Sequence, residues 1–205
     1  MKSSIAFLGS GGHARSCLDV AEAANLEVVG MIAPTRDGIP PGVTWLGTDS
    51  EIVGLAERGV TFLVAVGHVG DPALRIRLWS LVKDYAGTLV SPSVTFSPRA
   101  FLGAGTVALH HAHVGPMARI GVNVILNTRS LVEHDAVIGD HCHVSTGAIV
   151  NGGCVVGEGA FIGSGAVLRE GVRVAAFATI AAGAIVVKDV DEPGVWAGVP
   201  ARRIR

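Results

Sequence analysis

Residues 120–138 read IGVNVILNTRSLVEHDAVI, and they belong to a longer stretch in which every sixth residue is apolar. The series runs without a slip from Val90 to Val186, and the residue four places after each member is small. A period of six fits neither the 3.6-residue turn of an α-helix nor the two-residue alternation of a simple strand. It is typical of a parallel β-helix built from hexapeptides. The sequence therefore predicts this fold from residue 90 to residue 205.

The hexapeptide period also predicts how the coils are built. Each hexapeptide supplies one short strand and one corner, and three of them close a triangular coil. The large apolar residue points into the prism, and the small residue fills the corner beside it. Stacked coils are separated by the usual strand spacing of about 4.8 Å. We therefore expect each residue to lie beside the residue three hexapeptides, or eighteen positions, further along the chain.

The first part of the chain alternates apolar runs with helical patterns, which predicts a small parallel, Rossmann-like α/β domain over residues 1–89. Thr48-Asp49-Ser50-Glu51 has the spacing of a capping box that opens a helix. The expected strands are 4–8, 26–32 and 61–66, and the expected helices end near Ala24, Arg58 and Tyr85.

A glycine-rich loop follows the first expected strand. Gly9-Ser10-Gly11-Gly12-His13-Ala14 satisfies the loose dinucleotide pattern, but Ala33 and Pro34 stand where an acidic residue would bind a ribose. Backbone N–H groups at the start of a helix still offer an anion site. The loop either binds a nucleotide phosphate or is a tight turn that joins strand to helix.

Other polar residues end or follow the third expected strand. Gly67 and His68 lie at its carboxyl end, the edge where open parallel sheets bind ligands. His68 is either a ligand contact or an exposed loop residue. Arg75 and Arg77 follow on the next helix, where one could reach a phosphate or both could lie on a solvated face.

His134 and Asp135 are the sharpest polar exception within the hexapeptides. Gly152 and Gly153 lie eighteen residues after them, which leaves an open shelf beside the imidazole. A histidine with a carboxylate neighbour suits a general base that removes a proton from an attacking amine or hydroxyl. The alternative is a solvated corner residue.

Three further polar groups stand out in the coil. His143 could contact a ligand or fill a corner, and Asn127 and Ser145 could form a stacked polar ladder. The cluster of His110, His111 and His113 could hold a metal, although no histidine lies eighteen residues from any of them.

The formal net charge of −1 gives no bulk attraction to nucleic acid or to an anionic membrane. The chain starts without an apolar run suited to a signal peptide, and no segment approaches the roughly 20 apolar residues of a membrane span. The cysteines show no disulfide framework, and Cys142 and Cys154 fall on small corner positions, which favours packing. We therefore expect a cytoplasmic protein without nucleic-acid or membrane partners.

Several stretches together resemble the bacterial sialic-acid O-acetyltransferase and UDP-4-amino-sugar N-acetyltransferase family. The resemblance covers nearly the whole chain. It implies a left-handed β-helix, acetyl-CoA as co-substrate, no metal, and a homotrimer with active sites between subunits. The stretches that carry it are Gly9–His13, Ile125–Thr128, Val132–Asp135, His141–Ser145 and Gly194–Arg202.

The same resemblance implies roles for single residues. His134 corresponds to the catalytic base of the family, and Asp135 to the carboxylate beside it. The positions that correspond to acetyl-CoA contacts are His143, Ser164 and Ala182. The positions that correspond to nucleotide-sugar contacts are Gly11, Gly12, His13 and Gly67. Relatives that act on UDP-sugars carry acidic residues where this chain has Ala33 and Pro34, so the nucleotide stays open.

The expected function is acetyl-CoA-dependent N-acetylation of a nucleotide-linked amino sugar of the 4-amino-4,6-dideoxy type, by direct transfer with a histidine base. Transfer to a sugar hydroxyl or to a non-sugar amine would use the same residues. A metal-dependent hydratase or lyase and a non-catalytic nucleotide-binding scaffold are the remaining alternatives.

Overall fold

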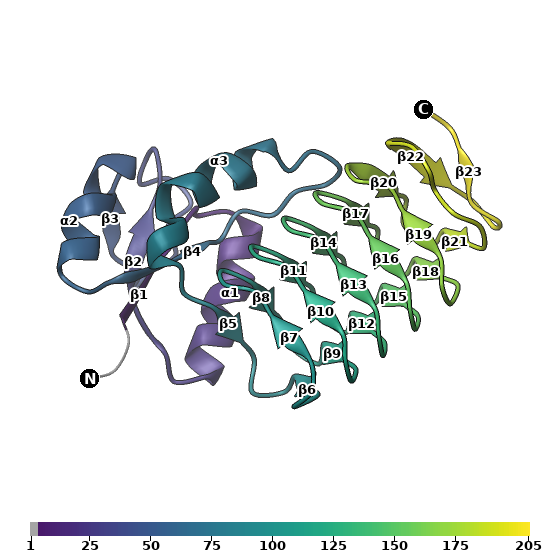
Figure 1. Cartoon of the computed structure of the whole chain (residues 1–205). Helices are drawn as coiled ribbons and strands as arrows, with labels where there is room; N and C mark the ends of the chain where they lie inside the picture. Colours follow the sequence, from purple (N-terminus) through teal and green to yellow (C-terminus); the bar gives the residue numbers. More distant parts are fainter. Residues whose placement is uncertain (1–3) are drawn as a thin grey trace.

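The structure is a computed structural model that describes residues 4–205. The first part of the chain folds into a four-stranded parallel sheet with strand order β3-β2-β1-β4 (Figure 1). Its strands are β1 (Ser4–Leu8), β2 (Glu27–Ile32), β3 (Trp45–Gly47) and β4 (Thr61–Val64). The three expected strands are confirmed. The short edge strand β3 was not predicted, because its three residues are too few to show an alternating pattern.

Two helices connect strands of this sheet, and a third follows β4 and leads into the coil. Their bounds are α1 (Gly12–Ala23), α2 (Ile52–Glu57), which follows the 3₁₀ turn η1 (Asp49–Glu51), and α3 (Ala73–Val82), which continues into η2 (Lys83–Tyr85). The predicted capping box at Thr48 is wrong. Thr48 does stand at the cap, but its hydroxyl lies 2.9 Å from Ser50 Oγ and bonds no backbone N–H, since the first turn is 3₁₀ rather than α. None of the helices from residue 4 onward is long and apolar enough to cross a membrane.

From Leu89 the chain winds into a parallel β-helix with three faces. Face 1 consists of β5 (Leu89–Val90), β8 (Val107–Ala108), β11 (Ile125–Leu126), β14 (His143–Val144), β17 (Phe161–Ile162) and β20 (Ala178–Ile180). Face 2 consists of β6 (Thr95–Phe96), β9 (His113–Val114), β12 (Leu131–Val132), β15 (Ile149–Val150), β18 (Val167–Leu168) and β21 (Ile185–Val186). Face 3 consists of β7 (Phe101–Leu102), β10 (Arg119–Ile120), β13 (Val137–Ile138), β16 (Val155–Val156) and β19 (Arg173–Val174).

The eighteen-residue register is confirmed. Ile125 pairs with His143, and His143 pairs with Phe161. We call the turn that follows face 1 the first corner, the turn after face 2 the second corner, and the turn after face 3 the third corner. The coil ends with β22 (Gly194–Ala197), parallel to β20, and β23 (Arg202–Arg203), antiparallel to β22.

The interior of the prism is filled as the hexapeptide pattern predicts. The second residue of each two-residue strand on the three faces points inward, as does Ile180 in β20, and the buried core runs from Ala108 to Ala201. Small residues, including Cys142 and Cys154, are buried at the corners. Both cysteines, like Cys17 in α1, are free thiols, so packing is confirmed as their place in the fold.

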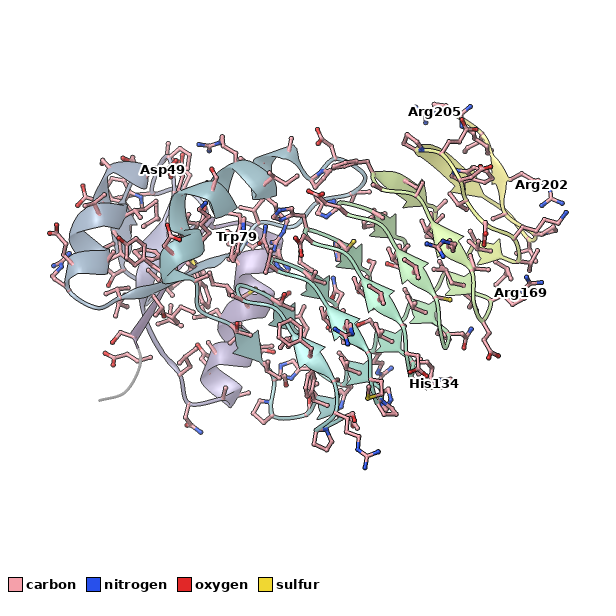
Figure 2. All side chains as sticks on the ribbon, viewed as in Figure 1. Asp49, Trp79, His134, Arg169, Arg202 and Arg205 are labelled. Atoms are coloured by element: carbon pink, nitrogen blue, oxygen red, sulfur yellow. The ribbon has the colours of Figure 1, made fainter. Side chains whose placement is uncertain are left out.

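The α/β domain rests on face 1 and the corners beside it. His68 follows β4, and the centroid of its ring lies 5.5 Å from that of His143 and 6.0 Å from that of Phe161, both on face 1. Trp79 of α3 lies against His141 in the third corner, and Asp19 of α1 reaches His110 in the first corner. Figure 2 shows His134 on an edge of the coil away from Trp79. One side of the prism is therefore covered by the domain, and the second corner stays free of it.

Candidate active site

The second corner presents His134 and Asp135 as a hydrogen-bonded pair. Nδ1 of His134 lies 2.9 Å from Oδ2 of Asp135. A carboxylate can only accept, so Nδ1–H donates, and in the neutral ring Nε2 keeps its lone pair. This hydrogen bond is the main reason that the pKa of His134 is raised above its ordinary value. The ring is about half exposed, so Nε2 is available to take a proton from a bound molecule.

The backbone of the corner fixes this pair. Asp135 has a left-handed φ of 59°, and its N–H donates to Pro116 O at 3.0 Å in the coil before. In the coil after, Gly153 N–H donates to His134 O, also at 3.0 Å. A side chain on Gly152 would collide with the imidazole, since its Cβ would stand 2.6 Å from Nε2 and Cε1. The predicted shelf above the ring is therefore present.

Two adjoining cavities, which together we call the pocket, lie between α1, the end of β4 and the first corner. They have volumes of about 450 and 330 Å³ and share His13 and Gly67 in their walls. Gly11 and Gly12 at the start of α1 line the smaller cavity, and His68, Asn127 and His143 line the larger one. The glycine-rich loop, the end of β4 and His143 are thus brought together.

The tautomer of His143 follows from its neighbours. Thr128 N–H can only donate, so the atom of Asn127 that it bonds at 2.8 Å is the carbonyl Oδ1. The Asn127 amide nitrogen then donates to His143 Nε2 at 3.1 Å. Nδ1 of His143, 2.9 Å from the carbonyl oxygen of His68, must carry the hydrogen. His143 is therefore held with its proton on Nδ1, and a second Asn127 amide hydrogen is left over beside the cavity that Asn127 lines.

The imidazoles of the pocket stay neutral. Burial is the main cause that lowers the pKa of His13 to about 3 and those of His68 and His143 to about 4. The charge of Arg75 lowers all three further. His134 and the pocket histidines are therefore opposites, since the pKa of His134 is raised and those of His13, His68 and His143 are lowered.

Two open alternatives in the sequence are decided by burial. His68 is buried at 8% exposure, so it is not an exposed loop residue. One of Arg75 and Arg77 was expected to reach a phosphate, or both to lie on a solvated face. The solvated face is wrong for Arg75, which is fully buried under the sheet edge. Arg77 does lie on a solvated face, where it pairs with Asp49 at 3.3 Å.

Ser164 and Ala182 lie exposed on the first corner, in successive coils beyond the pocket. Gly183 N–H donates to Ser164 O at 2.9 Å, which stacks the two turns. Ser164 Oγ also lies 2.9 Å from Ser145 Oγ. The expected ladder between Asn127 and Ser145 is wrong, because Asn127 bonds His143 and Ser145 bonds Ser164.

The His134–Asp135 pair and the pocket lie on different corners of the same chain. His134 follows β12 on face 2, whereas Asn127 follows β11 on face 1. Face 2 of the coil separates them, so one chain does not bring its own His134 to its own pocket.

The His110 cluster is engaged in other contacts. Nε2 of His110 lies 2.8 Å from Asp19, and Nδ1 lies 2.7 Å from Ser91 Oγ. Over residues 4–205, no group of three or more histidine, cysteine or acidic side chains is arranged to hold a metal.

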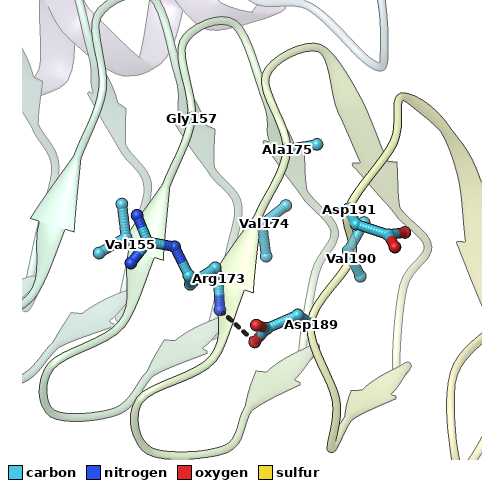
Figure 3. Close-up of a pocket in the computed structure, with 8 residues that line it drawn as sticks. All are labelled: Val155, Gly157, Arg173, Val174, Ala175, Asp189, Val190 and Asp191. Carbon is cyan, nitrogen blue, oxygen red and sulfur yellow. Dashed lines mark hydrogen bonds between the residues drawn. The ribbon is translucent and has the colours of Figure 1, made fainter.

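A separate cavity of about 360 Å³ opens on face 3 near the C-terminal end (Figure 3). Its wall combines valines with Arg173, Asp189 and Asp191, and Arg173 N–H donates to the Asp189 carboxylate at 2.9 Å. None of the predicted site residues lines it.

Comparison with known proteins identifies the family. Residues 4–80 match the PglD N-terminal domain, and residues 135–170 match the bacterial transferase hexapeptide family. The perosamine N-acetyltransferase from Caulobacter crescentus, solved with CoA and GDP-perosamine, is 30% identical over 100% of this chain and 98% of its own, with a TM-score of 0.90. This chain belongs to the hexapeptide-repeat acetyltransferases.

A second solved member is also similar along its whole length. It is the acetyltransferase domain of PglB from Neisseria gonorrhoeae FA1090 in complex with acetyl coenzyme A, 28% identical over 100% of both chains, with a TM-score of 0.93. Among curated proteins, no sequence matches this chain. The membership confirms the predicted left-handed β-helix and acyltransferase activity.

Sequence reasoning singled out Asn127 and Arg75 of this hexapeptide-repeat acetyltransferase but missed what each contacts. Asn127 was interpreted as part of a structural ladder, but it donates to His143. The available signal for this contact was its position in the register. Asn127 follows by two residues Ile125, which pairs with His143. Arg75 gave no signal, because nothing in a helix sequence shows that a charged residue faces inward.

Proposed function

We propose that this acetyltransferase moves the acetyl group of acetyl-CoA to the amine of a nucleotide-linked amino sugar, of the 4-amino-4,6-dideoxy type. The observation that carries the proposal is the His134–Asp135 pair, with Nδ1–H bound to the carboxylate and Nε2 open below Gly152. Support for the two substrates comes from the relatives, one solved with CoA and GDP-perosamine and the other with acetyl coenzyme A.

The chemistry follows from the open Nε2. The amine nitrogen attacks the thioester carbonyl while Nε2 of His134 takes its proton, and the imidazolium is stabilised by Asp135. The tetrahedral intermediate collapses, the C–S bond breaks, and the leaving CoA thiolate takes up the proton. Backbone N–H groups of the coil are suitable donors to the oxyanion.

Direct transfer is favoured over an acyl-enzyme. Burial raises the pKa values of the Cys17 and Cys142 thiols to about 12, and all three cysteines are buried. A buried thiol with a raised pKa is a poor nucleophile. The amine therefore attacks the thioester itself.

The acceptor is assigned to the pocket. Backbone N–H groups of Gly11 and Gly12 at the start of α1 favour the anionic diphosphate, and His13 and Gly67 line the space toward the coil. His143 on face 1, with Ser164 and Ala182 in the adjoining first corner of later coils, offers a track for acetyl-CoA. Ala33 and Pro34 supply no carboxylate to bind the nucleoside. The nucleobase of the acceptor is therefore left to the panel of nucleotide sugars described below.

The separation of base and pocket supports a homotrimer in which each site joins two subunits. The second corner carries acidic groups beside His134, among them Glu133 and Glu170, which add to the raised pKa of His134. Arg129 lies in the first corner, and Arg15 of α1 lines another cavity with His110 and Thr128 of that corner. Opposite charges on these two surfaces favour contact between copies.

An acetyl-transfer assay with the full chain tests the proposal. Acetyl-CoA is the donor, and the acceptors are UDP-, GDP- and dTDP-linked 4-amino sugars, with sialic acid as the hydroxyl acceptor. The readout is thiol release, followed by the mass of the product and its stability in alkali. We expect thiol release with an amino sugar and an alkali-stable product that has gained one acetyl group. An alkali-labile product would show ester formation instead, and release with none of the acceptors would contradict the proposal.

A further inference from the structure

Arg75 is a buried cation without an acidic partner. Its side chain is fully buried, and it forms no ion pair with any residue between 4 and 205. Burying an unpaired charge is costly unless hydrogen bonds compensate for it. Here the compensation consists of neutral oxygens only, from Val64, Val66 and Asn123. A cation retained at such a place suggests a task that a neutral side chain would not perform.

The oxygens that Arg75 binds belong to two separate parts of the fold. Nη1 donates to the carbonyls of Val64 and Val66, which bracket the end of β4. Nη2 donates to the carbonyl and the side chain of Asn123 in the third corner of the coil. The planar guanidinium therefore fastens the end of β4 to the coil in one fixed orientation.

Further hydrogen bonds connect Asn123 to His68 through His141. The Asn123 amide donates to Nδ1 of His141 at 3.0 Å, and Nε2–H of His68 donates to the carbonyl of His141 at 3.2 Å. The segment that Arg75 holds through Val66 thus reaches His68, two residues later. The carbonyl of His68 is the acceptor for Nδ1–H of His143.

We propose that Arg75 is a positioning residue of the pocket: by fixing the end of β4 on the coil, it places the His68 carbonyl so that His143 keeps its proton on Nδ1 and Asn127 turns its free amide hydrogen toward the acceptor. This inference rests on the proposed function of the pocket. If the His68 carbonyl moved away, His143 would be free to carry its proton on Nε2, and that nitrogen would no longer accept from Asn127. The Asn127 amide would then keep its bond from Thr128 N–H but lose one of the two hydrogen bonds that hold it.

Arg75→Lys tests the proposal, because lysine keeps the charge but cannot donate to β4 and to Asn123 in a fork. Arg77→Lys, on the exposed face of the same helix, is the matched control. We expect Arg75→Lys to raise the KM for a GDP-linked 4-amino-4,6-dideoxy sugar about tenfold or more. The pH at which His134 titrates should stay unchanged, because His134 lies on another corner of the coil, and Arg77→Lys should behave as wild type.

A second pair of variants covers the case in which Arg75→Lys does not fold. Asn123 has a left-handed φ of 53°, which glycine adopts without strain. Asn123→Gly removes the side-chain acceptor of Arg75 and should raise the same KM. Asn123→Asp keeps an oxygen for Arg75 and should restore it. Variants that lower thermal stability but leave this KM unchanged would overturn the proposal.

The tautomer gives a readout that needs no turnover. In ¹⁵N NMR spectra of the free full-length protein, His143 should show Nδ1–H in the wild type and a mixture of tautomers in Arg75→Lys or Asn123→Gly. An unchanged tautomer in both variants would contradict the inference. Since this measurement involves no acceptor, it separates failure of the positioning role from failure of the proposed function.

Discussion

Gly152 leaves the space that the imidazole of His134 occupies, because a Cβ atom on Gly152 would stand 2.6 Å from Nε2. Its backbone is not left-handed, and the three atoms nearest to an added Cβ all belong to the ring. We expect Gly152→Ala to displace His134 and to lower kcat by roughly a hundredfold. Gly54→Ala, at an open position in α2, is the control and should retain full activity. Full activity in Gly152→Ala would show that the position of this ring does not limit turnover.

His134→Ala removes the proposed base and leaves the first corner intact. We expect the turnover number to fall by about a hundredfold or more, because the amine must then lose its proton to water. CoA affinity, measured by calorimetry, should stay close to that of the wild type. Turnover that survives the substitution would rule out His134 as the base.

The Asp135 carboxylate sets the pH at which the base works. Since it raises the pKa of His134, activity should be lost on acidification through a pH above the ordinary imidazole range. Asp135→Asn removes the charge and is compatible with the left-handed φ of 59°. We expect the acid limb of the kcat profile to move to lower pH, with a lower plateau. A limb that stays in place would show that another group titrates.

A site shared between subunits predicts complementation. His134→Ala lacks the proposed base and His13→Ala alters the pocket, so each variant alone should be weakly active. After unfolding and refolding as an equal mixture, random assembly would pair an intact base with an intact pocket at about a quarter of the sites. The recovered activity is measured against each variant refolded alone. Absence of recovery would place base and pocket in one subunit.

The buried histidines predict loss of stability in acid. The pKa values of His13, His68 and His143 lie at about 3 to 4 in the folded protein, below the ordinary 6.5 of an unfolded chain. The unfolded state therefore binds more protons between these values, so stability is fully present above pH 6.5 and falls below it. At pH 5 the loss is about 2 kcal/mol per histidine. Thermal unfolding followed from pH 7.5 to pH 5 checks this, and a flat melting temperature would contradict it.

The coil was predictable because a period of six residues fits neither an α-helix nor a simple alternating strand. A large residue at every sixth place and a small one four later define strands, corners and register, and the pairing of Ile125 with His143 confirms all three. His134 was found for the same reason, since a titratable side chain facing Gly152 interrupts a regular pattern. A regular background makes a functional exception visible.

The contacts between the domain and the coil were not predictable in this way. Arg75 and His68 are buried only because α3 and the end of β4 pack on face 1, and this docking is set by tertiary contacts rather than by a local pattern. The capping box at Thr48 failed for a related reason. Its spacing fits an α-helix, but the chain begins this helix with a 3₁₀ turn.

The uniform pairing of each strand with the strand one coil away makes the prism extensible in whole units. Removing or inserting a block of eighteen residues beyond the base would keep every inward and outward position, whereas any other length would rotate the faces against one another. The reach from His134 to the C-terminal cap can therefore change only in steps of about 4.8 Å. Adding or removing coils would fit the prism to a longer or shorter acyl donor and leave the second corner with His134 unchanged.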